Sequence, residues 1–204
     1  MVTATIQQTQ QRMYTAAEFE AMSLPDGRFE LLAGELIEMG GAGGQHGRIG
    51  VRFVSRLDLF TDERGLGSTY GPDTEFVIQD RPDTVVVPDT AFVRAERLIP
   101  EREQTGFLRV VPDLVLEVVS SSDTRREVAN KVGLYLAVGV KIIIVADPKT
   151  MTFVVHRPGE PSLILGEDDV FVAGDLIPGF SVRVGDVMRP RSERAARSDE
   201  GSGG

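Results

Sequence analysis

Cysteine is absent from the sequence, and only two of its 204 residues are histidine. The lack of cysteine excludes disulfides, zinc–thiolate centres and thiol nucleophiles. Two histidines leave little room for a histidine-rich metal site. The metal chemistry that remains open to this chain is the binding of hard cations by carboxylates.

Long apolar runs are missing as well. No window approaches the roughly 20 apolar residues that a membrane-spanning helix needs, and residues 1–13 lack the charged start and apolar block of a secretory signal. We therefore expect a cytoplasmic protein that does not associate with membranes. The formal net charge of −9 argues against avid, non-specific nucleic-acid binding, so any nucleic-acid site must be local.

The composition is that of one folded domain. A chain of 204 residues with 41% hydrophobic content can bury a substantial core. Residues 1–13 are polar and aperiodic, and residues 189–204 are charged and rich in small side chains. We predict disordered tails at 1–13 and 189–204 on either side of a single domain at 14–188.

Hydrophobic patterning predicts a mixed sheet with helices on both faces, an α/β (α+β) fold. A capping box at Thr15 and Glu18 opens a short helix, and apolar residues spaced three or four apart predict a helix from about 45 to 63. A further helix runs between a capping box at Thr124 and a terminating Gly139. Predicted strands are a hairpin at 28–39, then 74–79, 84–93, 113–120 and 141–147, with an antiparallel extension at 152–157, 162–166 and 180–184.

Glu117 and Lys131 stand where apolar side chains are expected. Both faces of the strand DLVLEVVS are otherwise apolar, which is typical of a strand in the middle of a sheet. Lys131 shares one helical stripe with Val128 and Tyr135, the face that packs on the sheet. The two residues form either a structural ion pair or part of a site. Replacing a catalytic lysine with methionine would lower turnover and leave the fold intact, whereas breaking a structural pair would lower stability.

A third inward-facing carboxylate would favour a functional site over a structural ion pair. Pro-Asp pairs recur along the chain, and those that contain Asp73, Asp83 and Asp113 are explained by ordinary turn chemistry. Asp113 also lies about 13 Å from Glu117 along the same strand, at about 3.3 Å per residue, too far to share one ion. Asp89 differs because it interrupts TVVVPDTAFV with apolar residues on both sides, as a residue at a bend in a buried strand would.

Several motifs follow one another in a recognisable order: VPDTAFV, PDLVLEVVSSSD, KVGLYLAVGV, IIIVADP and LIPGFSV. Together with RFELLAGEL and GGQHGRI, they make residues 14–188 resemble the Uma-two-type endonucleases of the PD-(D/E)XK restriction-endonuclease-like superfamily. The resemblance implies a nuclease core in which Asp89 is the motif's aspartate and Glu117 its acidic partner. Val119 stands where the superfamily lysine belongs. In this branch that lysine is placed on the following helix, a position that Lys131 matches.

The resemblance also implies weaker candidates. His46 corresponds to a recurrent family histidine, although a histidine at a helix start often faces solvent. Glu30 corresponds to a family glutamate and could be a further metal ligand, but an alternating hairpin often carries an outward glutamate. Arg48, Arg52 and Arg56 form a basic stripe on one helix face. That stripe either contacts phosphates or is a solvated face that pairs with acids.

These observations predict a metal-dependent endonuclease acting on DNA. Asp89 and Glu117, with the backbone carbonyl of Val118, would hold Mg²⁺ or Mn²⁺, and Lys131 would activate water or stabilise charge. A degenerate nuclease core that serves as a binding or scaffolding protein is the main alternative, and hydrolysis of a small phosphodiester is a third reading. We also predict a homodimer, although no particular motif indicates one.

Overall fold

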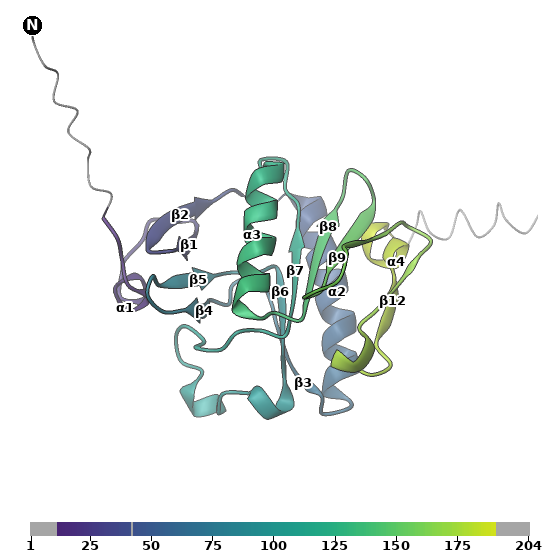
Figure 1. Ribbon diagram of the computed structural model, residues 1–204, viewed down its shortest axis with the longest axis horizontal. Coiled ribbons are helices and arrows are strands. Elements are labelled where there is room, and N and C mark those ends of the chain that lie inside the picture. The colour runs from purple at the N-terminus through teal and green to yellow at the C-terminus, as the bar shows by residue number, and fades with distance from the viewer. Residues whose placement is uncertain (1–11, 42, 191–204) are drawn as a thin grey trace, which may run out of the picture.

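Two sheets and a short ribbon form the framework of the computed structural model, which describes residues 12–41 and 43–190 (Figure 1). In spatial order, the larger sheet contains β10 (Leu163–Leu165), β9 (Thr152–His156), β8 (Ile142–Asp147), β7 (Leu114–Val118), β6 (Thr90–Arg94) and β3 (Gly67–Tyr70). The smaller sheet contains β2 (Glu35–Met39), β1 (Arg28–Leu32), β5 (Thr84–Val86) and β4 (Phe76–Gln79), and the ribbon pairs β11 (Val170–Val172) with β12 (Ser181–Arg183).

Helices cover both faces of the larger sheet (Figure 1). The α-helices are α1 (Ala16–Glu20), α2 (Gly44–Asp62), α3 (Arg125–Val138) and α4 (Val184–Met188), and short 3₁₀ turns occupy Ala95–Arg97, Glu101–Glu103 and Gly174–Leu176. In the view of Figure 1, α3 lies in front of the strands and α2 behind them. The predicted mixed α+β architecture is confirmed.

Strand β7 lies in the middle of the larger sheet, as its two apolar faces predict. It pairs in parallel with β8 and antiparallel with β6. Leu114, Leu116 and Val118 face α2, whereas Val115 packs in the core beneath α3. Because side chains alternate along a strand, Glu117 points to the α3 side.

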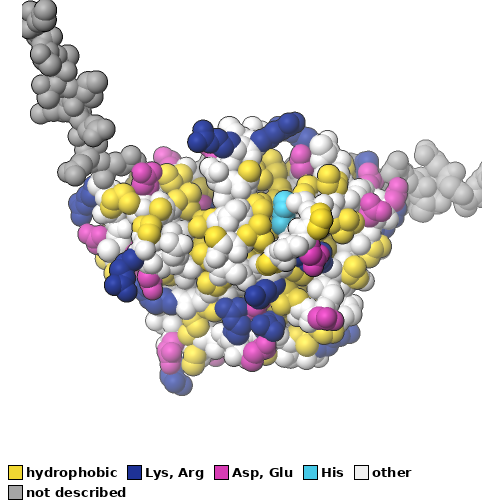
Figure 2. All heavy atoms as spheres, viewed as in Figure 1, with side chains coloured by type: hydrophobic (Ala, Val, Ile, Leu, Met, Phe, Trp, Pro, Cys, Tyr) yellow, Lys and Arg dark blue, Asp and Glu magenta, His cyan; other side chains and the backbone are white. Residues whose placement is uncertain are grey.

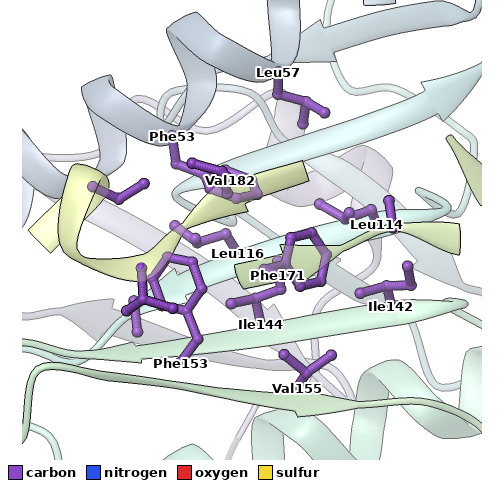
Figure 3. Close-up of a cluster of buried hydrophobic side chains, with 14 of the residues drawn as sticks. Phe53, Leu57, Leu114, Leu116, Ile142, Ile144, Phe153, Val155, Phe171 and Val182 are labelled. Carbon is purple, nitrogen blue, oxygen red and sulfur yellow. The ribbon is translucent and has the colours of Figure 1, made fainter. Parts of the chain in front are cut away.

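The larger core lies between the sheet and α2. Ile49, Phe53 and Leu57 of α2 are fully buried, and the Phe53 ring lies 6.0 Å from that of Phe153. Figure 3 shows Phe53 and Leu57 above a layer of β7 and β8 side chains that includes Leu116. This packing fixes α2, and with it the position of His46 near the start of that helix.

Local signals at the ends of elements are confirmed. Both capping boxes are formed, at Thr15 with Glu18 and at Thr124 with Glu127. Gly139 ends α3 at a φ of 95°, the left-handed conformation that a glycine adopts without a steric penalty. The hairpin of β1 and β2 turns at Ala33 and Gly34, both with positive φ, as its pattern predicts.

One predicted strand is wrong. Residues 84–93 form two strands rather than one, since β5 belongs to the smaller sheet and β6 to the larger sheet. Pro88 lacks an amide proton and restricts the residue before it, which suits the point where the chain leaves one sheet for the other. Asp89 therefore lies at the junction of the two sheets and not at a bend within one strand.

Sequence patterning also missed three elements: β3, β11 and α4. Strand β3 has the sequence GSTY, which carries a single large apolar group, and β11 contains only three residues. Neither is long enough to show a period. The strands predicted at 152–157 and 162–166 do extend the larger sheet antiparallel, but the one predicted at 180–184 pairs with β11 in the separate ribbon.

Most of the predicted tails, 1–13 and 189–204, lies outside the described residues. Of the parts described, Arg12 forms an ion pair with Glu18, and Arg189 forms one with Glu167. Among the described residues, no helix has both the length and the apolar character needed to cross a membrane. The cytoplasmic location and the homodimer stay predictions.

Candidate functional site

Five predicted site residues come together around one cavity of about 570 Å³. Glu30 comes from β1, His46 from the first turn of α2, and Asp89 from the link between β5 and β6. Glu117 comes from β7 and Lys131 from α3. The cavity therefore lies where the small sheet, the large sheet and both long helices meet.

Lys131 joins two carboxylates. Its Nζ lies 2.9 Å from Oε1 of Glu30 and 3.0 Å from Oε1 of Glu117. The Lys131 and Glu117 side chains are only 15% and 16% exposed, and that of Glu30 is 1% exposed. The inward direction predicted from the helical stripe is confirmed, and the ion pair has a third member that the stripe did not reveal.

The two partners protect the ammonium from deprotonation. Burial lowers the pKa of Lys131, but the carboxylates of Glu117 and Glu30 outweigh burial and raise that pKa above its usual value. Lys131 is thus a fixed positive charge. Burial alone would have lowered the pKa of Lys131, and a lowered pKa is what a lysine needs to act as a general base.

Glu117 is held by a hydroxyl as well as by the ammonium. The Tyr135 hydroxyl donates a hydrogen bond of 2.6 Å to Oε1 of Glu117. Burial raises the pKa of Glu117 to about 7, although the charge of Lys131 acts in the opposite direction. The carboxyl group therefore changes charge near neutral pH.

Asp89 is fixed by the backbone and by a histidine. Its Oδ2 accepts a hydrogen bond of 2.8 Å from the Val118 amide and lies 3.1 Å from Nε2 of His46, while Arg28 lies 3.7 Å from Oδ1. Burial raises the pKa of Asp89, but these three groups outweigh it, and the net pKa is lowered. The hydrogen bond to Asp89 raises the pKa of His46 in turn. His46 thus faces the cavity rather than solvent.

Glu30 also points inward. Its Oε1 accepts a hydrogen bond of 2.8 Å from the amide of Val87, two residues before Asp89. This bond ties the hairpin to the link that carries Asp89. Glu30 therefore does not have the outward orientation that is common for a glutamate in an alternating hairpin.

Sequence patterning missed two residues of the site, Tyr135 and Arg28. Tyr135 was assigned to the apolar stripe of α3, but a fully buried tyrosine hydroxyl needs a partner, and this rule could have pointed to Glu117. Arg28 donates to the carbonyls of Pro72 and Val87 at 2.9 and 3.2 Å and lines the cavity. No sequence pattern distinguishes Arg28 from an exposed strand-end arginine.

Asp113 lies outside the cavity, as the spacing argument predicts. It is fully buried and accepts hydrogen bonds from the Arg97 side chain at 2.6 Å and the Arg94 amide at 3.0 Å. Its role is thus more than that of a turn residue, because it anchors the chain before β7 to the end of β6.

The predicted basic stripe lies away from the cavity. Arg48 and Arg52 donate to backbone carbonyls at the end of α4, and Arg56 donates to the carbonyl of Arg52 at 2.8 Å. None of the three lines the cavity that the described residues form. Phosphate contact by this stripe stays a prediction.

The donor set suits a hard cation in its chemistry. Carboxylate oxygens are the ligands that Mg²⁺ and Mn²⁺ prefer, and each carboxylate offers about four lone-pair positions. Oδ1 of Asp89 has the 3.7 Å contact with Arg28, and Oε2 of Glu117 has one bond of 3.1 Å, to Lys131. Both oxygens keep acceptor capacity toward the cavity. Within the described part of the chain, however, no three His, Asp or Glu side chains already stand in a metal-binding arrangement.

Tyr135→Phe tests how Glu117 is held. The variant removes one 2.6 Å hydrogen bond to a buried carboxylate and keeps the ring that packs on the sheet. We expect the free energy of unfolding to fall by about 1–3 kcal/mol at pH 8, since hydrogen bonds to charged groups are worth that much. Urea denaturation measures the change. A loss below about 0.5 kcal/mol would show that water replaces the hydroxyl.

Comparisons with known proteins identify the family and the fold. The profile of the Uma2 family, described as "Putative restriction endonuclease", matches residues 16–185. A solved structure from Anabaena variabilis ATCC 29413, described as a "putative nuclease belonging to DUF820", superposes with a TM-score of 0.75 at 19% identity, covering 85% of this chain and 97% of that one. No curated protein matches the chain. The family match spans most of the domain, and the chain therefore belongs to the Uma2 family.

Proposed function

We propose that this chain is a nuclease, and specifically a divalent-metal-dependent endonuclease that hydrolyses phosphodiester bonds in DNA. The observation that carries the proposal is the meeting of Asp89, Glu117, Glu30, His46 and Lys131 at one cavity. The family description supports the same reading.

Asp89 and Glu117 would hold Mg²⁺ or Mn²⁺, with Glu30 as a further ligand. A divalent ion there would neutralise charge on a phosphoryl oxygen and make a bound water more acidic. The chain's own residues supply the rest. Lys131 stabilises negative charge that develops on the phosphoryl group, Tyr135 orients Glu117, and His46 holds a proton suited to the leaving oxygen.

A cleavage assay tests the proposal. Supercoiled plasmid is incubated with purified protein in Mg²⁺, in Mn²⁺ or in EDTA, and nicked and linear products are separated on a gel. We expect products with either metal and none with EDTA. The same assay on a labelled RNA of matching sequence tests whether the sugar matters. Full cleavage in EDTA would contradict metal dependence.

One observation favours a second function. Lys131 and Tyr135 already hold the Glu117 carboxylate, and the described residues contain no preformed three-residue metal group. A binding or scaffolding protein on the nuclease core would keep such a cluster for stability alone. Metal binding distinguishes the two functions.

Metal should stabilise the folded state. A ligand at 100 times its dissociation constant adds about 2.7 kcal/mol to the free energy of unfolding. We expect the melting temperature to rise with millimolar Mg²⁺ or Mn²⁺ in the wild type and to stay constant in Glu117→Gln. Differential scanning fluorimetry measures both. Equal melting temperatures with and without metal in the wild type would favour the scaffolding function.

Metal affinity should depend on pH through Glu117. Its pKa of about 7 means that the carboxyl group is protonated below neutrality, and a metal must displace that proton to bind. We expect the apparent affinity to be highest above pH 7 and to weaken by up to about tenfold for each unit below it. Calorimetric titration with Mn²⁺ at pH 6 and pH 8 measures the difference. The same affinity at both values would exclude Glu117 as a ligand.

A further inference from the structure

The proposed catalytic groups lie inside the cavity and not on an open surface. The side chains of Asp89 and Lys131 are only 7% and 15% exposed. A phosphodiester must therefore enter the cavity before it reaches them. The cavity volume of about 570 Å³ lies within the usual range for sites that enclose one small organic molecule.

Acidic side chains line the same cavity from two sides. Glu38 comes from β2, Asp123 lies just before the N-cap of α3, and Glu127 lies in the first turn of that helix; all three are exposed. Arg125 and Arg126 of the same turn are exposed as well, but they do not line the cavity. Figure 1 shows the β1–β2 hairpin beside α3, and both elements contribute carboxylates to the lining of the cavity. Duplex DNA carries one negative charge per about 1.7 Å of its axis, and the carboxylates that line the cavity would repel it there.

On the face drawn in Figure 2, basic side chains do not form one continuous area. Lysine and arginine side chains gather in separate groups at the upper edge and in the lower centre, with apolar and uncharged side chains between them. A long duplex needs many phosphate contacts in a row. Separate groups of this kind suit a ligand with few phosphates.

Inside the cavity the lining fits one unpaired nucleotide. Leu32, Val87, Val119 and Val132 provide apolar contacts for the face of a base, and Arg28 and Lys131 bring positive charge for its phosphate. A base inside a duplex cannot reach such a lining without leaving its stack, which costs a few kcal/mol. An already unpaired base avoids that cost.

We propose that the cavity admits an unpaired nucleotide and excludes the double helix, so that the chain cuts single-stranded or locally unpaired DNA in preference to fully paired DNA. The inference rests on the proposed nuclease function and names its substrate. In this arrangement the apolar lining contacts the base, and Arg28 and Lys131 contact the phosphate. The acidic walls from β2 and α3 are the element that disfavours a duplex.

Three labelled DNA substrates of one sequence test the inference: a single strand, its blunt duplex, and a duplex with a central unpaired bubble. The wild type is assayed in Mn²⁺, with a chromogenic phosphodiester as a fourth substrate. We expect kcat/KM on the single strand to exceed that on the blunt duplex by about tenfold or more, with cuts in the bubbled duplex confined to the bubble. Equal or faster cleavage of the blunt duplex would overturn the inference and leave the nuclease function standing. Cleavage of the chromogenic ester alone would overturn the inference too, and no cleavage of any substrate would remove both.

Glu38→Lys tests the contribution of the acidic wall, with Glu160→Lys as its matched control. Glu160 is exposed in the turn before β10 and does not line the cavity. Both variants change the net charge equally. We expect only Glu38→Lys to raise duplex cleavage relative to single-strand cleavage, by about three- to tenfold at low salt. The same change in both variants would assign the preference to net charge and overturn the role of the cavity wall.

Discussion

Lys131→Met is expected to lower the free energy of unfolding by about 3–5 kcal/mol at pH 8 and to abolish metal-dependent cleavage. The variant keeps most of the apolar stem and leaves the buried carboxylates of Glu30 and Glu117 facing each other without a counter-charge. The stability loss should shrink as the pH is lowered, because protonation of either carboxylate removes the repulsion. Urea denaturation at pH 5 and pH 8 measures both effects.

The double variant Lys131→Met with Glu117→Gln separates stability from catalysis. Removing one carboxylate together with its cation should recover much of the lost stability, because only Glu30 then remains to be neutralised. Cleavage should stay absent. A Lys131→Met protein with wild-type stability and full cleavage would contradict both the structural and the catalytic role of the lysine.

Asp89→Asn is expected to reduce metal-dependent DNA cleavage by at least about 100-fold and to leave the protein folded. An asparagine oxygen can still accept the hydrogen bond from the Val118 amide, so the junction between the sheets keeps its shape. What is lost is the ligand charge and the ionic partner of His46. Plasmid nicking rates and circular dichroism on the same sample measure activity and folding.

Asp113→Asn is the matched control for that variant. Asp113 is also a buried aspartate after a proline, but it pairs with Arg97 and does not line the cavity. We expect it to lose stability and to keep its cleavage rate at a temperature where it is folded. Retained nicking by Asp89→Asn, or an equal loss in both variants, would show that the cavity is not the catalytic site.

The sequence predicted the site best where a polar residue broke an otherwise regular pattern. Glu117 and Lys131 were visible because each interrupts an apolar face, and the cost of burying a charge indicated either an ion pair or part of a site. Asp89 was visible for the same reason. Its neighbours in the site, Glu30 and His46, came only from the family resemblance, because a hairpin glutamate and a helix-start histidine break no pattern.

The parts that sequence reasoning missed depend on contacts between distant segments. The apolar positions of residues 84–93 are all compatible with a single strand, so one strand was predicted. The partners of β5 and β6, however, lie in different sheets. The basic stripe was predicted either to contact phosphates or to form a solvated face that pairs with acids. Helix α4 was not predicted, and the carbonyls that accept hydrogen bonds from Arg48 and Arg52 lie at the end of that helix. Tertiary partners, and not local preference, determine these features.

The order in which the site residues appear along the chain has a consequence for synthesis. Glu30 and Lys131 touch in the folded protein, although about 100 residues lie between them in sequence. A chain still emerging from the ribosome would present Glu30, Asp89 and Glu117 before α3 brings the positive charge that balances them. Loop-closure entropy makes such a distant contact slow to form. The proposed site would therefore be complete only once α3 is in place.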